Sequence, residues 1–337
     1  MFLRIIFLLH IFFIMSVEAD DNVTNRSWIE YIDQKHKIFS QNVVEFFDSI
    51  DMAMGKTNQN IDEDIDSSNF LENKKSMDSF FKSDKFIEES EESFIRLRIG
   101  SILQTKESAD FIYKVRAQIP LNRAKDRFQL FIEDIQERYF NKTTPIKTAQ
   151  NNTDVGVRYL APDYKGVKSQ YSVGISSFSG YVKSRYSKEF KFDNWIIEPA
   201  QEFKYSLKSD WSEQTNIYFD RLLSENSIFR TTLHHKTQAH IDGFDYALAL
   251  SYYLTLSQRK GFSFEQQFWG NSKYICDEHP SRYNGISDYS TFISWRQNIF
   301  RKWITYEIKP GISFHRQYDY EPNYILNFYV DLYFGNI

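Results

Sequence analysis

Long runs in which apolar and polar residues alternate restrict the fold of this chain more than any other feature. In the last run the apolar residues all fall on one face: Tyr324, Leu326, Phe328, Val330, Leu332 and Phe334. The stretches 244–257 and 304–316 repeat this pattern. A period of two predicts β-strands. Soluble strands average about 5–6 residues, whereas a strand that crosses a bilayer at a tilt needs about 9–11. The runs therefore predict strands of membrane-spanning length.

The alternation begins near Ser93 and continues to the end of the chain. About 14 runs can be counted, and an even number returns both ends of a barrel to the same side of a membrane. The two longest connections, 138–152 and 271–285, then lie at the opposite end, where long extracellular loops belong. Counts of 12 or 16 have the same parity. The predicted strands are 93–104, 108–119, 127–137, 153–161, 168–179, 181–192, 195–207, 210–222, 226–240, 244–257, 260–270, 286–299, 301–316 and 323–335.

The composition agrees with a membrane barrel. Aromatic residues make up 18% of the chain, and aromatics both favour strands and form the girdles of membrane barrels. The mature chain has no apolar stretch near 20 residues that could cross a membrane as a helix. The apolar faces of so many strands exceed what one soluble interior can bury. The predicted fold is thus an all-β, antiparallel, up-and-down transmembrane β-barrel over residues 93–337.

The first 19 residues have the pattern of a signal peptide. Arg4 supplies a positive charge, and the apolar run from Ile5 to Met15 has the length of a signal-peptide core. Val17 and Ala19 satisfy the small-residue rule for cleavage, so the mature chain is expected to begin near Asp20. The single cysteine, Cys276, excludes an internal disulfide.

Residues 20–92 have helical rather than strand periodicity. Apolar residues recur at helical spacing from Trp28 to Ile50, and Asp and Glu crowd residues 48–92. Two interpretations remain open. The segment is either a periplasmic helical hairpin that caps the barrel and contacts a partner protein or peptidoglycan, or a plug that enters the lumen, where its acidity would complement basic residues.

The polar faces of the strands carry charges at mid-strand. Four basic residues form a stripe on the first two strands, and acids lie on other strands around the wall. One interpretation is an ion-pair network that fills the barrel; the other is a selective channel whose basic stripe attracts anions. The stripe comprises Arg96, Arg98, Lys114 and Arg116, and the acids are Glu265, Glu307 and Asp331.

The C-terminus is similar to that of bacterial outer-membrane proteins. The last strand alternates and ends in Tyr333 and Phe334, three residues before the final Ile337. In that class a terminal aromatic, normally the last residue, helps the barrel assembly machinery to recognise the strand. The resemblance implies the bacterial outer membrane as location, with its lipid and the barrel assembly machinery as partners. The net charge of −4 gives no basic excess for nucleic acid.

Residues with catalytic chemistry are few. His234 and His240 are candidates for the base of a lipid-modifying enzyme, but six residues along a strand span about 20 Å, too far for one metal ion. No metal site, cofactor or catalytic motif is assigned. The function expected is a structural barrel or a small-solute channel. The alternatives are an outer-membrane lipid-modifying enzyme and an export or assembly factor that works through residues 20–92.

Overall fold

A computed structural model describes residues 25–54, 77, 80–81, 94–121, 127–135, 152–176, 178–240, 242–257, 259–274, 283–299 and 301–335. The signal peptide expected at residues 1–19 and most of the segment 55–93 lie outside the described residues. Within the described residues, no helix is both long and apolar enough to cross a membrane.

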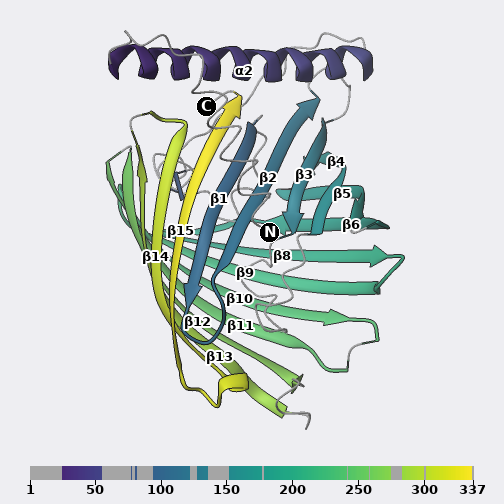
Figure 1. Cartoon of the computed structure of the whole chain (residues 1–337). Coiled ribbons are helices and arrows are strands. Elements are labelled where there is room, and N and C mark those ends of the chain that lie inside the picture. Colours follow the sequence, from purple (N-terminus) through teal and green to yellow (C-terminus); the bar gives the residue numbers. More distant parts are fainter. Residues whose placement is uncertain are drawn as a thin grey trace.

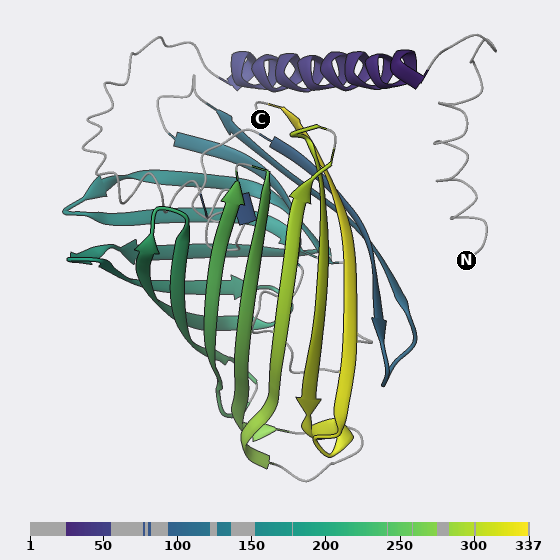
Figure 2. The same ribbon diagram turned by 90° about the vertical axis from the view of Figure 1, so that its left-hand side faces the viewer.

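The described strands form one antiparallel sheet that closes on itself (Figures 1 and 2). Each strand pairs with the next along the chain, β6 pairs with β8, and β1 pairs with β15 to complete the ring. The short β7 follows β6 and continues its pairing with β8 as far as Trp195, so the 15 described strands make a wall of 14. The strands are β1 (Phe94–Gln104), β2 (Asp110–Leu121), β3 (Arg127–Ile135), β4 (Asn152–Tyr164), β5 (Val167–Ser176), β6 (Ser179–Lys188), β7 (Phe190–Phe192), β8 (Trp195–Ser206), β9 (Asp210–Ser224), β10 (Ser227–Gln238), β11 (Asp245–Ser257), β12 (Lys260–Tyr274), β13 (Tyr283–Asn298), β14 (Ile304–His315) and β15 (Pro322–Gly335).

Burial of the side chains alternates along each strand. On β15, Asp331 and Tyr333 are buried and face inward, whereas Leu326 and Phe328 are exposed on the outside. Outward-facing apolar residues are exposed all around the wall: Phe111, Val157, Val173, Val182, Phe203, Leu233, Phe264, Ile293 and Ile308. An apolar outside around a polar inside is the arrangement of a barrel that faces lipid. The predicted transmembrane up-and-down barrel is confirmed.

The two longest connections lie at the end of the barrel that the count of 14 strands predicted for them. Phe94 and Gly335 pair at one end of the barrel, which we call the terminal end. The connections from β3 to β4 and from β12 to β13 both leave the opposite end. The predicted strand boundaries agree with the observed ones to within four residues. The largest differences are at β6, which ends at Lys188, and at β12, which extends to Tyr274.

The helix α2 (Asn25–Met54) lies crosswise to β1, β2 and β15 at the terminal end (Figures 1 and 2). Asp33 anchors it to the turn between β13 and β14 by accepting a hydrogen bond from Arg301 Nε at 2.6 Å. This hydrogen bond holds the pKa of the Asp33 carboxyl below its usual value. The anchor is therefore fully formed above the ordinary pKa of an aspartate and is lost as the pH falls through the lowered value.

Candidate functional site in the barrel lumen

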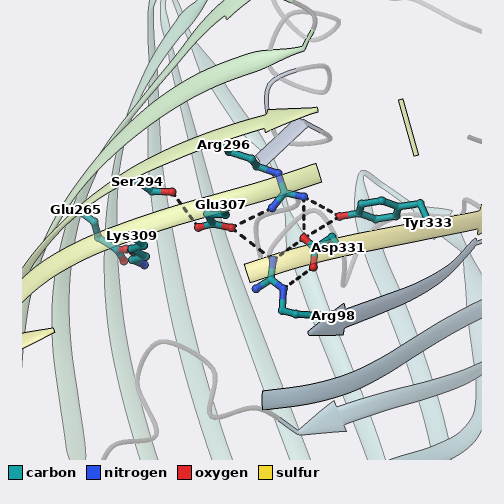
Figure 3. Close-up of polar contacts among 8 residues, drawn as sticks. All are labelled: Arg98, Glu265, Ser294, Arg296, Glu307, Lys309, Asp331 and Tyr333. Carbon is teal, nitrogen blue, oxygen red and sulfur yellow. Dashed lines mark hydrogen bonds and ion pairs between the residues drawn. The ribbon is translucent and has the colours of Figure 1, made fainter. Parts of the chain in front are cut away.

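A connected polar cluster of described residues lies on the inner wall where the ring closes between β15 and β1 (Figure 3). Asp331 accepts two hydrogen bonds from Arg98, from Nε at 2.6 Å and from Nη2 at 2.8 Å. Arg296 on β13 also donates to Asp331, from Nη2 at 3.0 Å. Asp331 is 1% exposed and Arg296 is 2% exposed. One carboxylate is thus held between two guanidinium groups in a site that water does not reach freely.

Glu307 on β14 extends this cluster. It accepts a hydrogen bond from Arg296 Nη1 at 3.0 Å, and Arg98 Nη2 lies 3.5 Å from the same carboxylate. The Ser294 hydroxyl donates to its other oxygen at 2.9 Å. The Tyr333 hydroxyl accepts from Arg296 Nη2 at 2.8 Å. Paired and hydrogen-bonded on several sides, the buried charges meet the condition under which a protein interior tolerates them.

A second group of inward charges lies on the neighbouring strands. Glu133 on β3 accepts from Arg116 at 3.2 Å and from Arg158 at 3.1 Å. Arg158 also lies over the ring of Phe131, with its guanidinium carbon 4.8 Å from the centroid. Asp154 on β4 lies directly opposite Glu133 and is buried, so two inward acids accompany the two arginines on this part of the wall.

The register of β1 and β2 places the predicted basic stripe in two directly opposed pairs. Arg96 faces Arg116, and Arg98 faces Lys114. Like charges directly opposite each other on neighbouring strands are destabilising. Arg98 and Arg116 offset this repulsion through acids on β15 and β3. Arg96 Nε is buried without a hydrogen-bond partner among the described residues.

The predicted acids are brought together only in part. Glu307 and Asp331 share Arg98 and Arg296, whereas Glu265 pairs separately with Lys309 at 3.0 Å (Figure 3). Tyr333 and Ser294 also belong to the cluster, although neither was predicted as a site residue. Tyr333 could have been found, since it lies two residues beyond Asp331 and shares its face. Nothing in the sequence around Ser294 indicates its role, because its hydrogen bond to Glu307 depends on the pairing of β13 with β14.

Ion pairing continues on the far wall. Arg230 on β10 makes two hydrogen bonds to Asp220 on β9, at 2.6 and 3.0 Å, and both side chains are buried. Lys183 on β6 lies 3.4 Å from Glu202 on β8. The charges of the lumen are therefore mostly distributed as cross-strand pairs that strengthen the wall.

The two candidate histidines lie in different surroundings. His234 faces the lumen from β10 and donates from Nδ1 to Asn216 Oδ1 at 2.7 Å. His240 lies beyond the end of β10, contrary to the expectation that both histidines lie on one strand. Because β10 ends at Gln238, His240 lies in the following turn with a positive φ of 64°, where its Nε2 donates to Asp210 at 2.5 Å. The structure therefore does not bring the two histidines together.

Part of the segment before the barrel reaches the inner wall. Met77 is buried against the inward-facing Ile228 and Tyr253, and Phe81 packs on the Tyr253 ring with centroids 5.0 Å apart. Gly261 makes room for this contact, because a Cβ there would lie 2.7 Å from both Phe80 and Phe81. Beyond α2, only Met77, Phe80 and Phe81 of the predicted helical segment 20–92 belong to the described residues.

Known proteins resemble this chain in structure, but their sequences are not detectably similar to it. No family model and no curated protein matches the chain. Among solved structures, a loop-deletion mutant of the outer-membrane protein OmpT of Vibrio cholerae is similar with a TM-score of 0.45 and 7% identity, over 72% of this chain and 98% of that one. The KdgM porin bound to oligogalacturonate has a TM-score of 0.35, 9% identity and coverages of 70% and 98%. OccK10 of Pseudomonas aeruginosa has a TM-score of 0.41, 6% identity and coverages of 72% and 98%.

Proposed function

We propose that this chain is a bacterial outer-membrane barrel that passes small solutes through a charged lumen and favours anions. The observation that carries the proposal is that the polarity of this barrel is the reverse of that of a soluble barrel. Its outside is apolar and exposed, and its inside holds charges of both signs. Only a closed barrel or a helix can satisfy its backbone hydrogen bonds in lipid. The outer membrane is the bacterial membrane in which such barrels reside, and insertion there would require the barrel assembly machinery.

The preference for anions rests on β1 and β2. Their four inward charges, Arg96, Arg98, Lys114 and Arg116, are all basic. The acids that pair with them lie on the neighbouring strands: Asp331 on β15 pairs with Arg98, and Glu133 on β3 pairs with Arg116. A wall lined by one sign of charge raises the local concentration of the opposite ion. Solutes that carry a carboxylate, sulfate or phosphate are the class that such a wall would favour.

Current through planar bilayers tests this proposal. Under a KCl gradient, we expect the full-length protein to give a reversal potential of the sign for chloride preference. Arg96→Gln combined with Arg116→Gln should move this potential most of the way to zero, because two of the four stripe charges are removed. The matched control is Lys106→Gln with Lys273→Gln, which removes two cations outside the stripe, at the end of the barrel opposite the terminal end, and should leave the potential nearly unchanged. Cation preference in the unmodified protein would contradict the proposal.

The lipid-modifying enzyme remains a second candidate because Asn216 and His234 form a hydrogen-bonded pair. An Asn–His pair is part of the Asn-His-Ser arrangement of outer-membrane phospholipases. However, His234 faces the lumen and is buried, whereas lipid substrates lie outside the wall. Lipid hydrolysis that is lost in His234→Ala, from a protein that carries no current, would favour the enzyme over the channel.

A further inference from the structure

The helix α2 rests on the outer side of the barrel rim rather than over the lumen. Val43 is buried against Ile119, and Phe128 and Leu130 pack around them. These wall residues face outward, since their neighbours Gln118 and Gln129 face the lumen and are 1% exposed. Val43 therefore packs on the apolar surface that faces lipid elsewhere on the barrel.

The other half of the contact lies at the end of β15. The Phe39 ring meets the ring of Phe334 edge-on, with centroids 4.9 Å apart, and Phe334 ends the outward apolar face of that strand. His36 stacks on Trp303 at 3.9 Å and donates from Nε2 to the Tyr333 carbonyl oxygen at 2.8 Å. Together with the ion pair between Asp33 and Arg301, these contacts fix how α2 is rotated about its axis.

This rotation leaves an apolar strip of α2 uncovered beside the contact face. Ile32 and Phe39, seven residues apart and hence on one side of the helix, are 48% and 50% exposed. Gln34 and Gln41, also seven residues apart, are exposed on the opposite side, since successive residues turn by about 100°. The strip adjoins Phe334 and so continues the outward apolar surface of the barrel.

We propose that α2 lies in the interface of the membrane, with Ile32 and Phe39 in the lipid of the leaflet at the terminal end of the barrel. This inference rests on the proposed membrane location. Its occupant is lipid rather than a protein, because the strip is continuous with the surface that contacts lipid along the strands. The crosswise course of α2 at the rim (Figures 1 and 2) is that of an amphipathic helix lying in the interface, with its apolar face at the boundary of headgroups and acyl chains.

Single fluorescent labels on the full-length protein test this inference. In a Cys276→Ser background, a bimane label is attached at Phe39→Cys or at the matched polar position Gln41→Cys. The protein is reconstituted in phosphatidylcholine vesicles with brominated acyl chains. We expect brominated lipid to quench the label at position 39 several-fold more than the label at 41, and aqueous iodide to show the reverse order. A label at Ile32→Cys should behave like position 39, which guards against a local effect of losing the Phe39 ring.

A label at Val173→Cys, on the outward face of β5, separates the two proposals. If brominated lipid quenches position 173 while iodide reaches positions 32 and 39 freely, the barrel is in the membrane but α2 is not at the lipid. That result would overturn this inference and leave the strip open to a protein partner. If position 173 is not quenched by brominated lipid, the proposed membrane barrel itself fails.

Discussion

Asp331→Asn is expected to lower the free energy of unfolding of the barrel by about 3 kcal/mol, since removing one partner of a buried ion pair leaves the others uncompensated. The carboxylate of Asp331 is 1% exposed and lies between Arg98 and Arg296. Asparagine keeps the shape but not the charge, so two guanidinium groups would remain buried with Glu307 as their nearest acid. Urea unfolding in phospholipid vesicles, followed by tryptophan fluorescence, measures the change.

The matched control for this substitution is Glu321→Gln. Glu321 pairs with Lys106 in the exposed connections at the end of the barrel opposite the terminal end. Surface pairs of this kind contribute little, so the unfolding midpoint should not move measurably. An equally small effect of Asp331→Asn would mean that water screens the cluster in Figure 3 and would contradict this prediction.

Ile293→Arg is expected to destabilise the inserted barrel by about 2–4 kcal/mol, the cost of an arginine on the lipid face near the bilayer midplane. Ile293 lies near the middle of the outward face of β13, opposite Phe264 on β12, and both side chains are exposed. In a soluble barrel the same change on an exposed surface would cost almost nothing. The fraction of folded protein after assembly into vesicles, read from heat-modifiable gel mobility, gives the result.

Ile293→Leu is the control, since it keeps an apolar side chain of the same volume at the same place. It should fold to the same extent as the unmodified chain. If Ile293→Arg folded as well as Ile293→Leu, the outward face of β13 would be in contact with water, and the lipid-facing surface assigned here would be wrong at that strand.

The barrel could be predicted from the sequence because its signal is local. A period of two assigns each residue to a face without knowledge of its neighbours, and β15 was expected at 323–335 and is observed at Pro322–Gly335. The stripe of β1 and β2 was found for the same reason. His240 shows the limit of this reasoning, since alternation does not reveal that the strand ends at Gln238.

The ion pairs could not be predicted in this way because they depend on register across the sheet. Arg98 meets Asp331 only because β1 pairs with β15, 233 positions along the chain. The position of α2 on the barrel could not be predicted either. Its apolar periodicity predicted a helix, but not that Val43 would pack on the outside of the wall. Such contacts depend on which distant strands the closed ring brings together. The residues around either partner in the sequence do not indicate this.

Cell fractionation combined with heat-modifiable gel mobility tests the central claim, that this chain is a membrane-spanning barrel of the outer membrane, most directly. We predict that the protein sediments with the outer membrane, resists extraction by high salt, and shifts its gel mobility when it is boiled in detergent. Recovery as a soluble periplasmic protein, with the same mobility before and after boiling, would contradict the claim.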